Sequence, residues 1–219
     1  MISIIIPACN EEKYLAETIN AIKEQEYKEY EIIVVCDGCT DSTEKIARKF
    51  TKKVVSLKRR VGPANAKNRG GDVATGSNLV FLDADTRLTA KTLSEIAKVL
   101  EKDKGIIGTC KITPSNKALK HRFFMGLKNR VMCPLGVSNG IIFCSKETFH
   151  DFKGFNPKLK KGEDGDFVRK IKKQRKFIIL QTPIISSTRR FEKKGYVKIG
   201  LYWIKEYLKP SNKDYELIR

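Results

Sequence analysis

The sequence predicts an α/β fold with a doubly wound, mostly parallel sheet flanked by helices. Short apolar runs alternate with amphipathic segments along residues 2–112. The runs are apolar at nearly every position, which is typical of strands covered on both faces. A chain of 219 residues suffices for one sizeable core but not for two full domains with additions. We therefore expect a single domain with two functional halves, residues 1–112 and 113–219.

The first half reads as strand and helix in regular alternation. Strands are expected at residues 2–6, 31–35, 54–57, 79–82 and 106–112, and helices at 14–25, 41–50, 63–74 and 89–100. Asp41 followed by Glu44 has the pattern of a capping box for the second helix. Apolar residues at helical spacing follow Thr89 in the fourth helix. This β-α-β-α order favours parallel strands joined by crossover helices.

The second half is less regular and strongly basic. We expect a basic amphipathic segment at 115–132, a helix at 163–173 and a terminal helix at 195–208, with short strands at 140–144 and 177–180 and a short helix at 146–152. Residues 1–110 carry 18 Lys and Arg against 16 Asp and Glu, whereas residues 111–219 carry 26 against 9. This half is expected to meet a membrane surface, a phosphorylated acceptor or nucleic acid. A Lys-rich face kept for solubility is the alternative.

The remaining composition indicates an intracellular, cytoplasmic protein. No apolar run approaches the length of a membrane span, and the N-terminus reads as a first strand and not as a signal peptide. The six cysteines fit reduced thiols. Cys36 and Cys39 match C-x-x-C, but no second pair completes a zinc site.

An acidic tetrapeptide, Asp83-Ala84-Asp85-Thr86, directly follows the apolar run at 79–82. Open α/β sheets bind ligands beyond the carboxyl ends of their strands. Two carboxylates on a short turn suit Mg²⁺ or Mn²⁺ when substrate phosphates complete the shell. The flanking strand favours this interpretation over an ordinary Asp-rich surface turn.

Four further polar clusters fall at expected strand ends or helix starts, at residues 7–12, 37–43, 62–71 and 161–167. Asp37 stands where a carboxylate can accept hydrogen bonds from a ribose or base, and Lys67 stands where it can reach a diphosphate. Glu163 and Asp164 open a helix, where acids favour the helix dipole but where a general base can also be placed. Helix capping, by Asn10 among others, is the structural alternative.

Two common phosphate-binding loops are missing from the sequence. There is neither a G-x-x-x-x-G-K-[ST] nor a G-x-G-x-x-G pattern. A metal ion on Asp83 and Asp85 is therefore the expected device for stabilising a phosphate leaving group.

Taken in order, the motifs resemble glycosyltransferase family 2 from residue 1 to about residue 190. They are Pro7-x-x-Asn10-Glu11, Asp37-Gly38-x-Thr40-Asp41, the segment from Gly62 to Asn68-x-Gly70, Asp83-Ala84-Asp85 and Glu163-Asp164. The resemblance implies a GT-A fold and an inverting transfer from a nucleotide-sugar, with a UDP- or GDP-sugar as donor and Mg²⁺ or Mn²⁺ as cofactor.

The resemblance also implies roles for individual residues. Donor binding would fall to Pro7, Ala8, Asn10, Glu11, Asp37, Lys67, Asp83 and Ala84. Asp85, with Asp83, would bind the metal, and Asp164, beside Glu163, would be the catalytic base. Acceptor binding would fall to Ser138, Asn139, Gly140, Arg189 and Arg190.

The sequence departs from the family pattern at several positions. Cys36 stands where many members have Asp, Cys39 where Ser is usual, and Lys67 where Arg is usual. The Gln-x-x-Arg-Trp motif of processive synthases is missing, and Ser187–Phe191 is similar to the corresponding region of small, non-processive members. A single sugar transfer, without chain extension, is expected.

The acceptor is expected to be a hydroxyl or phosphate on a glycan or a lipid-linked molecule. The terminal segment interleaves Tyr196, Val197, Leu201, Trp203, Ile204 and Leu208 with Lys194, Lys198, Lys205 and Lys209. It could lie on an anionic membrane, making the protein peripheral on the cytoplasmic face, or it could cover the sheet.

Two other classes of function compete with this interpretation. A nucleotidyltransferase that makes nucleotide-sugars would share the sheet and metal, but it usually carries a Gly-rich first loop with Arg and Lys. A basic nucleic-acid-binding protein would explain the charge. No recognised nucleic-acid motif supports that class, and we expect no nucleic-acid partner.

Overall fold

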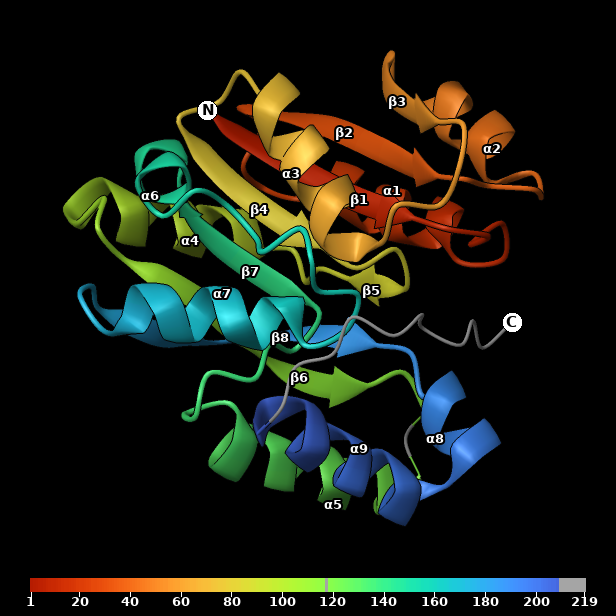
Figure 1. The fold of residues 1–219 in the computed structure, drawn as a ribbon, viewed down its shortest axis with the longest axis vertical. Helices are drawn as coiled ribbons and strands as arrows, with labels where there is room; N and C mark the ends of the chain where they lie inside the picture. Colours follow the sequence, from red (N-terminus) through yellow and green to blue (C-terminus); the bar gives the residue numbers. More distant parts are fainter. Residues whose placement is uncertain (117, 209–219) are drawn as a thin grey trace.

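One eight-stranded sheet organises the computed structural model, which describes residues 1–116 and 118–208 (Figure 1). The spatial order is β3-β2-β1-β4-β7-β6-β8-β5. The strands are β1 (Ile2–Ala8), β2 (Tyr30–Asp37), β3 (Lys53–Leu57), β4 (Asn78–Leu82), β5 (Thr86–Arg87), β6 (Ile107–Pro114), β7 (Ile141–Ser145) and β8 (Phe177–Ser186). The expected α/β fold with a mostly parallel sheet is confirmed.

Strand direction changes in the middle of the sheet. β1, β2, β3 and β4 run parallel to one another, and β6 and β8 form a second parallel pair. β7 lies between these groups and is antiparallel to both β4 and β6. As a result, the start of β7 meets the carboxyl ends of β4 and β6 at one edge of the sheet.

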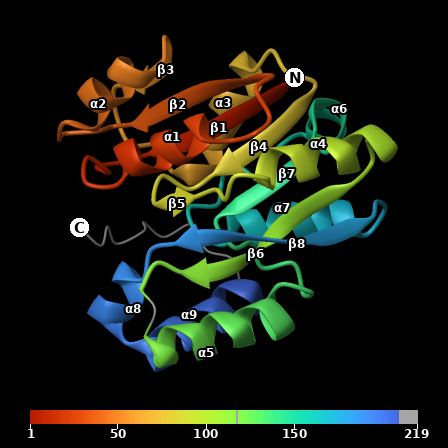
Figure 2. The same ribbon diagram turned by 180° about the vertical axis from the view of Figure 1, so that it is seen from behind.

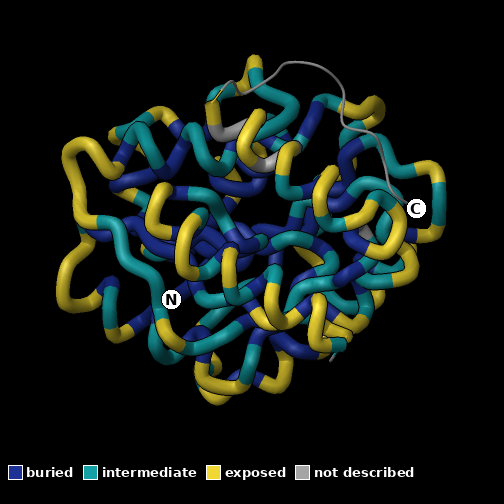
Figure 3. Tube along the Cα trace, turned by 90° about the horizontal axis from the view of Figure 1, so that it is seen from below, coloured by how far each residue is buried: buried dark blue, intermediate teal, exposed yellow. Residues whose placement is uncertain are grey.

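Helices cover both faces of the sheet (Figures 1 and 2). Alternate β1 residues face opposite ways, with Ile4 and Ile6 in one apolar cluster and Ile5 in the other. The first cluster includes buried residues of α1 (Leu15–Lys23), α2 (Thr43–Phe50) and α4 (Thr92–Lys102). The second includes those of α3 (Pro63–Val73), α6 (Lys146–Asp151) and α7 (Glu163–Lys172). Figure 3 shows the buried residues running through the middle of the molecule.

The remaining helices form a layer at one end of the molecule, beneath β6 (Figures 1 and 2). They are α5 (Leu119–Leu127), its π-helical continuation η1 (Lys128–Met132), α8 (Arg189–Lys194) and α9 (Tyr196–Leu208). Ile112, Met125, Phe191 and Ile199 form their small buried cluster. The side chain of Trp203 and the whole of Lys209 lie outside the residues that the structure describes.

Several local predictions need correction. The basic segment becomes helical only at Leu119, and the last strand continues to Ser186 instead of ending at residue 180. β5 and α8 were not expected. The capping box is wrong, because Glu44 bonds to Arg48 and Ser56, while Asp41 Oδ1 accepts from the Thr43 backbone N–H at 2.9 Å.

Among the described residues, no helix is long and apolar enough to cross a membrane.

Candidate active site

A cavity of about 300 Å³ opens where the carboxyl ends of β1, β2, β4, β6 and β8 meet the start of β7. Convergence of strand ends explains why motifs far apart in the chain line one space. All but one of the expected site residues line it: Pro7, Ala8, Asn10, Glu11, Asp37, Lys67, Asp83, Ala84, Asp85, Ser138, Asn139, Gly140, Glu163, Asp164 and Arg189. The exception, Arg190, has a side chain outside the description.

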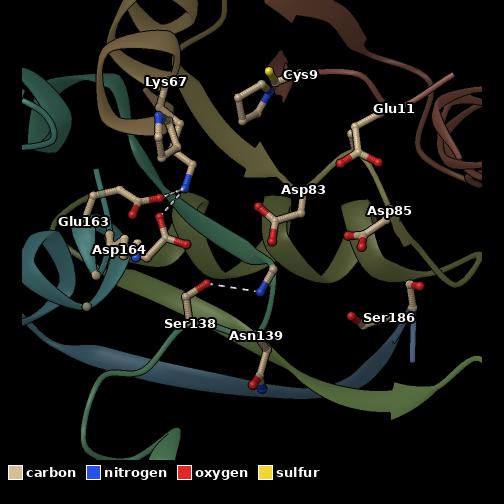
Figure 4. Close-up of a pocket in the computed structure, with 18 of the residues that line it drawn as sticks. Cys9, Glu11, Lys67, Asp83, Asp85, Ser138, Asn139, Glu163, Asp164 and Ser186 are labelled. Atoms are coloured by element: carbon tan, nitrogen blue, oxygen red, sulfur yellow. Dashed lines mark hydrogen bonds and ion pairs between the residues drawn. The ribbon is translucent and has the colours of Figure 1, made fainter. Parts of the chain in front are cut away.

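The acidic turn spans two parts of the sheet. Asp83 follows β4, whereas β5, only three residues beyond β4, pairs with β8. Two backbone bonds fix the turn: the Asp83 N–H donates to the Gly140 carbonyl at 2.9 Å, and the Ser187 N–H donates to the Asp85 carbonyl at 3.3 Å. In Figure 4, Asp83 lies between Asp85 and Asp164. The carboxylates are therefore held on a short, supported backbone.

Gly140 allows the start of β7 to lie against this turn. Its φ is +89°, in the left-handed region that favours glycine. A Cβ there would lie 2.8 Å from Thr86 Oγ1 and 3.2 Å from Asp83 Oδ2. A larger residue would have to displace the acidic turn.

Arg189 pairs with the acids at the donor side of the cavity. Its two terminal nitrogens lie 2.7 Å from the Glu11 carboxylate oxygens, and Nη2 lies 3.0 Å from Asp85 Oδ2. The guanidinium also stacks over the Tyr14 ring at 4.5 Å. Burial alone would lower the pKa of Arg189, but the bonds to Glu11 and the charge of Asp85 raise it. The acceptor role expected for Arg189 stays a prediction, and its contacts are with the residues expected to bind donor and metal.

A lysine and two carboxylates form the opposite wall. Buried Lys67 reaches from α3 to the first turn of α7, where Nζ lies 2.9 Å from Glu163 Oε1 and also bonds Asp164 Oδ1 (Figure 4). Burial raises the pKa of Asp164 to about 6, with Lys67 opposing the shift and Glu163 and Asp83 adding to it. Lys67 therefore contacts Asp164, the residue expected to act as the catalytic base. Its expected contact with a diphosphate stays a prediction.

Asp37 and Asn10 have structural partners that the sequence did not reveal. The Asp37 carboxylate accepts from the backbone N–H groups of Val61 at 2.7 Å and Gly62 at 2.9 Å, fixing the loop before α3. Asn10 does not cap a helix. Instead, its Oδ1 accepts from the Thr40 N–H at 2.8 Å, which ties the loops after β1 and β2 together. Their roles in donor binding stay predictions.

Asn139 is the most buried of the residues expected at the acceptor. Its Nδ2 donates to the Cys110 carbonyl at 2.8 Å, while its Oδ1 is buried and has no protein partner among the described residues. Ser138 Oγ accepts from the Gly140 N–H at 3.2 Å.

Sequence motifs missed part of the cavity lining. The missed residues include Met125, Lys128, Arg169, Ser186 and Ile199. They come from β8 and from parts of helices that lie outside the motifs. The excess charge of residues 111–219 pointed to this region but not to individual positions.

The acidic turn fits a hard divalent cation. It offers carboxylate oxygens, the preferred ligands of Mg²⁺ and Mn²⁺, and it already faces a cationic group, Arg189. No group of three or more His, Cys, Asp or Glu side chains able to hold a metal occurs in residues 1–116 and 118–208. A cation on Asp83 and Asp85 would complete its shell with substrate oxygens.

The sheet and its cavity define a protein of the GT-A class. A mannosyltransferase from Pyrobaculum calidifontis, solved with GDP-Man and Mn²⁺, is similar with a TM-score of 0.73 and 21% identity, over 94% of this chain and 61% of that one. Staphylococcus aureus TarS 1–349, solved with UDP-GlcNAc, gives 0.69 and 23%, over 85% and 58%. The expected GT-A fold is confirmed.

The family model for glycosyl transferase family 2 matches residues 3–147, so the chain belongs to that family. It is 31% identical over 134 residues to a GalNAc(5)-diNAcBac-PP-undecaprenol beta-1,3-glucosyltransferase of Campylobacter jejuni, covering 58% of this chain and 43% of the relative. It is 33% identical over 113 residues to glycosyltransferase GlyG of Streptococcus pneumoniae, covering 49% and 38%. The chain thus spans less than half the length of these two relatives. The resemblance inferred from the motifs is confirmed.

Proposed function

We propose that the protein transfers a sugar, with inversion, from a nucleoside-diphosphate sugar to a hydroxyl or phosphate of an acceptor. The observation that carries this proposal is the shared cavity. The acidic turn lines one part of it, and Asp164, held by buried Lys67, lines another. A leaving diphosphate and an attacking acceptor need these two environments at once.

Donor binding is assigned to the ends of β1, β2 and β4. The nucleoside would contact Pro7, Ala8, Asn10, Glu11, Asp37 and Ala84, all of which line the cavity. Similar structures were solved with UDP-GlcNAc and with GDP-Man, which supports a UDP- or GDP-sugar donor.

Asp85, with Asp83, would hold Mg²⁺ or Mn²⁺ at the donor diphosphate. When bound, the cation supplies positive charge that stabilises the leaving group. Mn²⁺ in the similar mannosyltransferase structure supports a divalent ion. Because Arg189 contacts Asp85, it would have to share this carboxylate with a bound cation or release it.

Asp164 would act as the general base. Its carboxylate would accept the proton of the acceptor hydroxyl while the oxygen attacks the anomeric carbon from the face opposite the leaving diphosphate. Attack from that face inverts the configuration. Lys67 and Glu163 position the carboxylate, because both lie within one buried ion-pair cluster with it.

The acceptor is proposed to bind over Ser138, Asn139 and Gly140. All three residues line the cavity, which supports this placement. Arg189 and Arg190, which follow β8, are retained as proposed contacts at this side. A relative whose name includes PP-undecaprenol supports a lipid-linked acceptor. A peripheral place on the cytoplasmic face of a membrane is proposed with it.

A thermal-shift screen tests the donor class. UDP-, GDP- and dTDP-sugars would be added with and without Mn²⁺, and a ligand at 100 times its Kd should stabilise the fold by about 2.7 kcal/mol. We expect one donor to raise Tm only with the metal. Replacing Asp85 by Ala should abolish metal-dependent donor binding in calorimetric titration, and unchanged affinity would exclude its role.

A further inference from the structure

The helical layer at the end of the molecule has two different faces. Its inner face is buried, with Met125 of α5 and Ile199 of α9 packed near Ile112 of β6. The helices also contact each other, since the ring centroids of Phe124 and Tyr196 are 4.5 Å apart. Figures 1 and 2 both place α5 and α9 together at this end.

The outer face of the same layer is apolar. Among the described residues, nine of the eleven exposed large hydrophobic side chains belong to this layer or directly follow η1. They are Leu119, Phe123, Leu127, Val131 and Leu135, and Val197, Leu201, Ile204 and Leu208. Spacings of three or four residues place each series on one side of its helix. An exposed apolar patch of this kind marks an interaction site.

The apolar side chains of the outer face are largely exposed to solvent. Leu119 is 79% exposed, Phe123 68%, Val197 72% and Leu208 74%. Such fractions show that neither helix uses this side to cover the sheet. Of the two alternatives expected for the terminal segment, covering the sheet applies to the inner face of α9, and the outer face is left exposed.

Cations surround the apolar residues. Lys120, Arg122 and Arg130 are exposed on α5 and η1, and Lys198 and Lys205 are exposed on α9. Residues 115–135 contain five Lys and Arg and no Asp or Glu. This fringe complements anionic headgroups and would repel the same face of a second copy of the chain.

We propose that the outer faces of α5, η1 and α9 form a docking surface that lies on an anionic lipid bilayer. The apolar side chains would enter the boundary between headgroups and acyl chains, and the Lys and Arg side chains would remain among the headgroups. The docking proposal rests on the proposed function in one respect, because docking would bring the cavity to the proposed lipid-linked acceptor.

The helices that carry this outer surface also line the cavity with their inner side. Met125, Phe191 and Ile199, on the inner face of the layer, line the cavity itself. Buried Lys128, at the start of the π-turn, lines it as well. The helices that would contact the bilayer thus also form the wall beside the acceptor residues, so docking sets this wall at the membrane surface.

Vesicle sedimentation tests the docking surface. The full chain would be mixed with vesicles of phosphatidylcholine alone or with added phosphatidylglycerol, at low and high salt. We expect binding to the anionic vesicles that weakens with salt. The double variant Phe123→Glu/Leu201→Glu should lose more than about tenfold in affinity, because each change removes an apolar side chain from the lipid contact and adds a negative charge near anionic headgroups. Val73→Glu, at an exposed apolar position at the end of α3, should bind like the parent protein.

The outcomes separate this inference from its rivals. Equal binding by the double variant and the parent, or no binding by the parent to either vesicle, would overturn it. A lipid-free dimer in sedimentation equilibrium that the double variant dissociates would instead make the face an interface between copies. Far-UV circular dichroism and donor-induced thermal shift check that the variant folds. If the protein binds anionic vesicles but no nucleotide-sugar raises its Tm, the proposed function is refuted and the docking surface is supported.

Discussion

Nη2 of Arg189 lies 3.0 Å from Oδ2 of Asp85, although 104 residues separate them in the chain. The same guanidinium holds Glu11 through both of its carboxylate oxygens. In this arrangement a side chain supplies the positive charge that the acidic turn would otherwise take from a metal ion. A divalent cation bound at Asp85 would therefore compete with Arg189 for this carboxylate.

Replacing Arg189 by Gln should tighten the binding of Mn²⁺ alone by about tenfold or more. Removing a positive charge beside Asp85 lowers the electrostatic cost of placing a dication there. Calorimetric titration of Mn²⁺ without nucleotide measures the effect. Arg48→Gln, at an exposed position on α2, serves as the control and should leave the affinity unchanged. A weaker Mn²⁺ affinity for Arg189→Gln would mean that the guanidinium helps to build the metal site.

Asp164→Asn should lower kcat by about 10²–10⁴ and leave donor affinity nearly intact, because an amide cannot accept the acceptor proton. Donor binding, followed by thermal shift, uses the opposite side of the cavity. Turnover close to that of the parent protein would refute the assignment of Asp164 as the base.

The activity should depend on pH through the same carboxyl group. Burial raises the pKa of Asp164 to about 6, and a base works only when it is deprotonated. We expect kcat/KM to fall about tenfold for each pH unit below that value and to level off above it. A pH–rate profile with saturating metal measures this, and a flat profile between about pH 5 and about pH 7 would contradict it.

Lys67→Met should lower the free energy of unfolding by about 3–5 kcal/mol, because it leaves two carboxylates in a mostly buried cluster without their cation. Chemical denaturation gives the value. Lys98→Met breaks the exposed pair with Glu95, whose atoms are 3.4 Å apart, and should cost less than about 1 kcal/mol. Similar losses in the two variants would show that the Lys67 cluster is not a buried network.

Gly140→Ala should destabilise the fold by about 1–3 kcal/mol, from the left-handed backbone and the contacts with Thr86 and Asp83. Metal-dependent donor binding should weaken with it, since the acidic turn has to shift. Gly126→Ala is the matched control. Within the part of the chain that the structure describes, no atom outside the adjacent backbone of α5 lies within 4 Å of the added Cβ, so the change should be neutral or stabilising by up to about 1 kcal/mol.

The sequence predicts which residues gather at the ends of β1, β2 and β4 because the signals for these positions are local. Asp83 and Asp85 directly follow an apolar strand, and parallel strands bring such ends together without further information. Arg189 could not be assigned in this way. Its contact with Glu11 spans 178 residues and depends on β8 continuing through Pro183 to Ser186. The hydrogen bonds from the Val61 and Gly62 N–H groups to Asp37 were equally hidden, since a carboxylate at a strand end looks the same in the sequence whether it binds a ligand or the backbone.

The exposed apolar residues of α5 and α9 also show the difference between local signals and long-range packing. Their amphipathic spacing is visible in the sequence, but which helices remain uncovered depends on packing. Met125 and Ile199 settle this by taking the inner positions. The sequence pattern alone does not distinguish a helix that is apolar on its buried side only from one that also has an exposed apolar side.

The reversed direction of β7 has a consequence for how such enzymes diversify. Five consecutive residue pairs, from Asn78 with Ser145 to Leu82 with Ile141, lock β7 to β4. The chain that leaves the sheet after Pro114 and returns at Ile141 is thus anchored at both ends by strands that do not depend on its length. Exchanging residues 115–139 for the corresponding segment of another family member should therefore change one wall of the cavity while the acidic turn at the neighbouring strand ends stays in place.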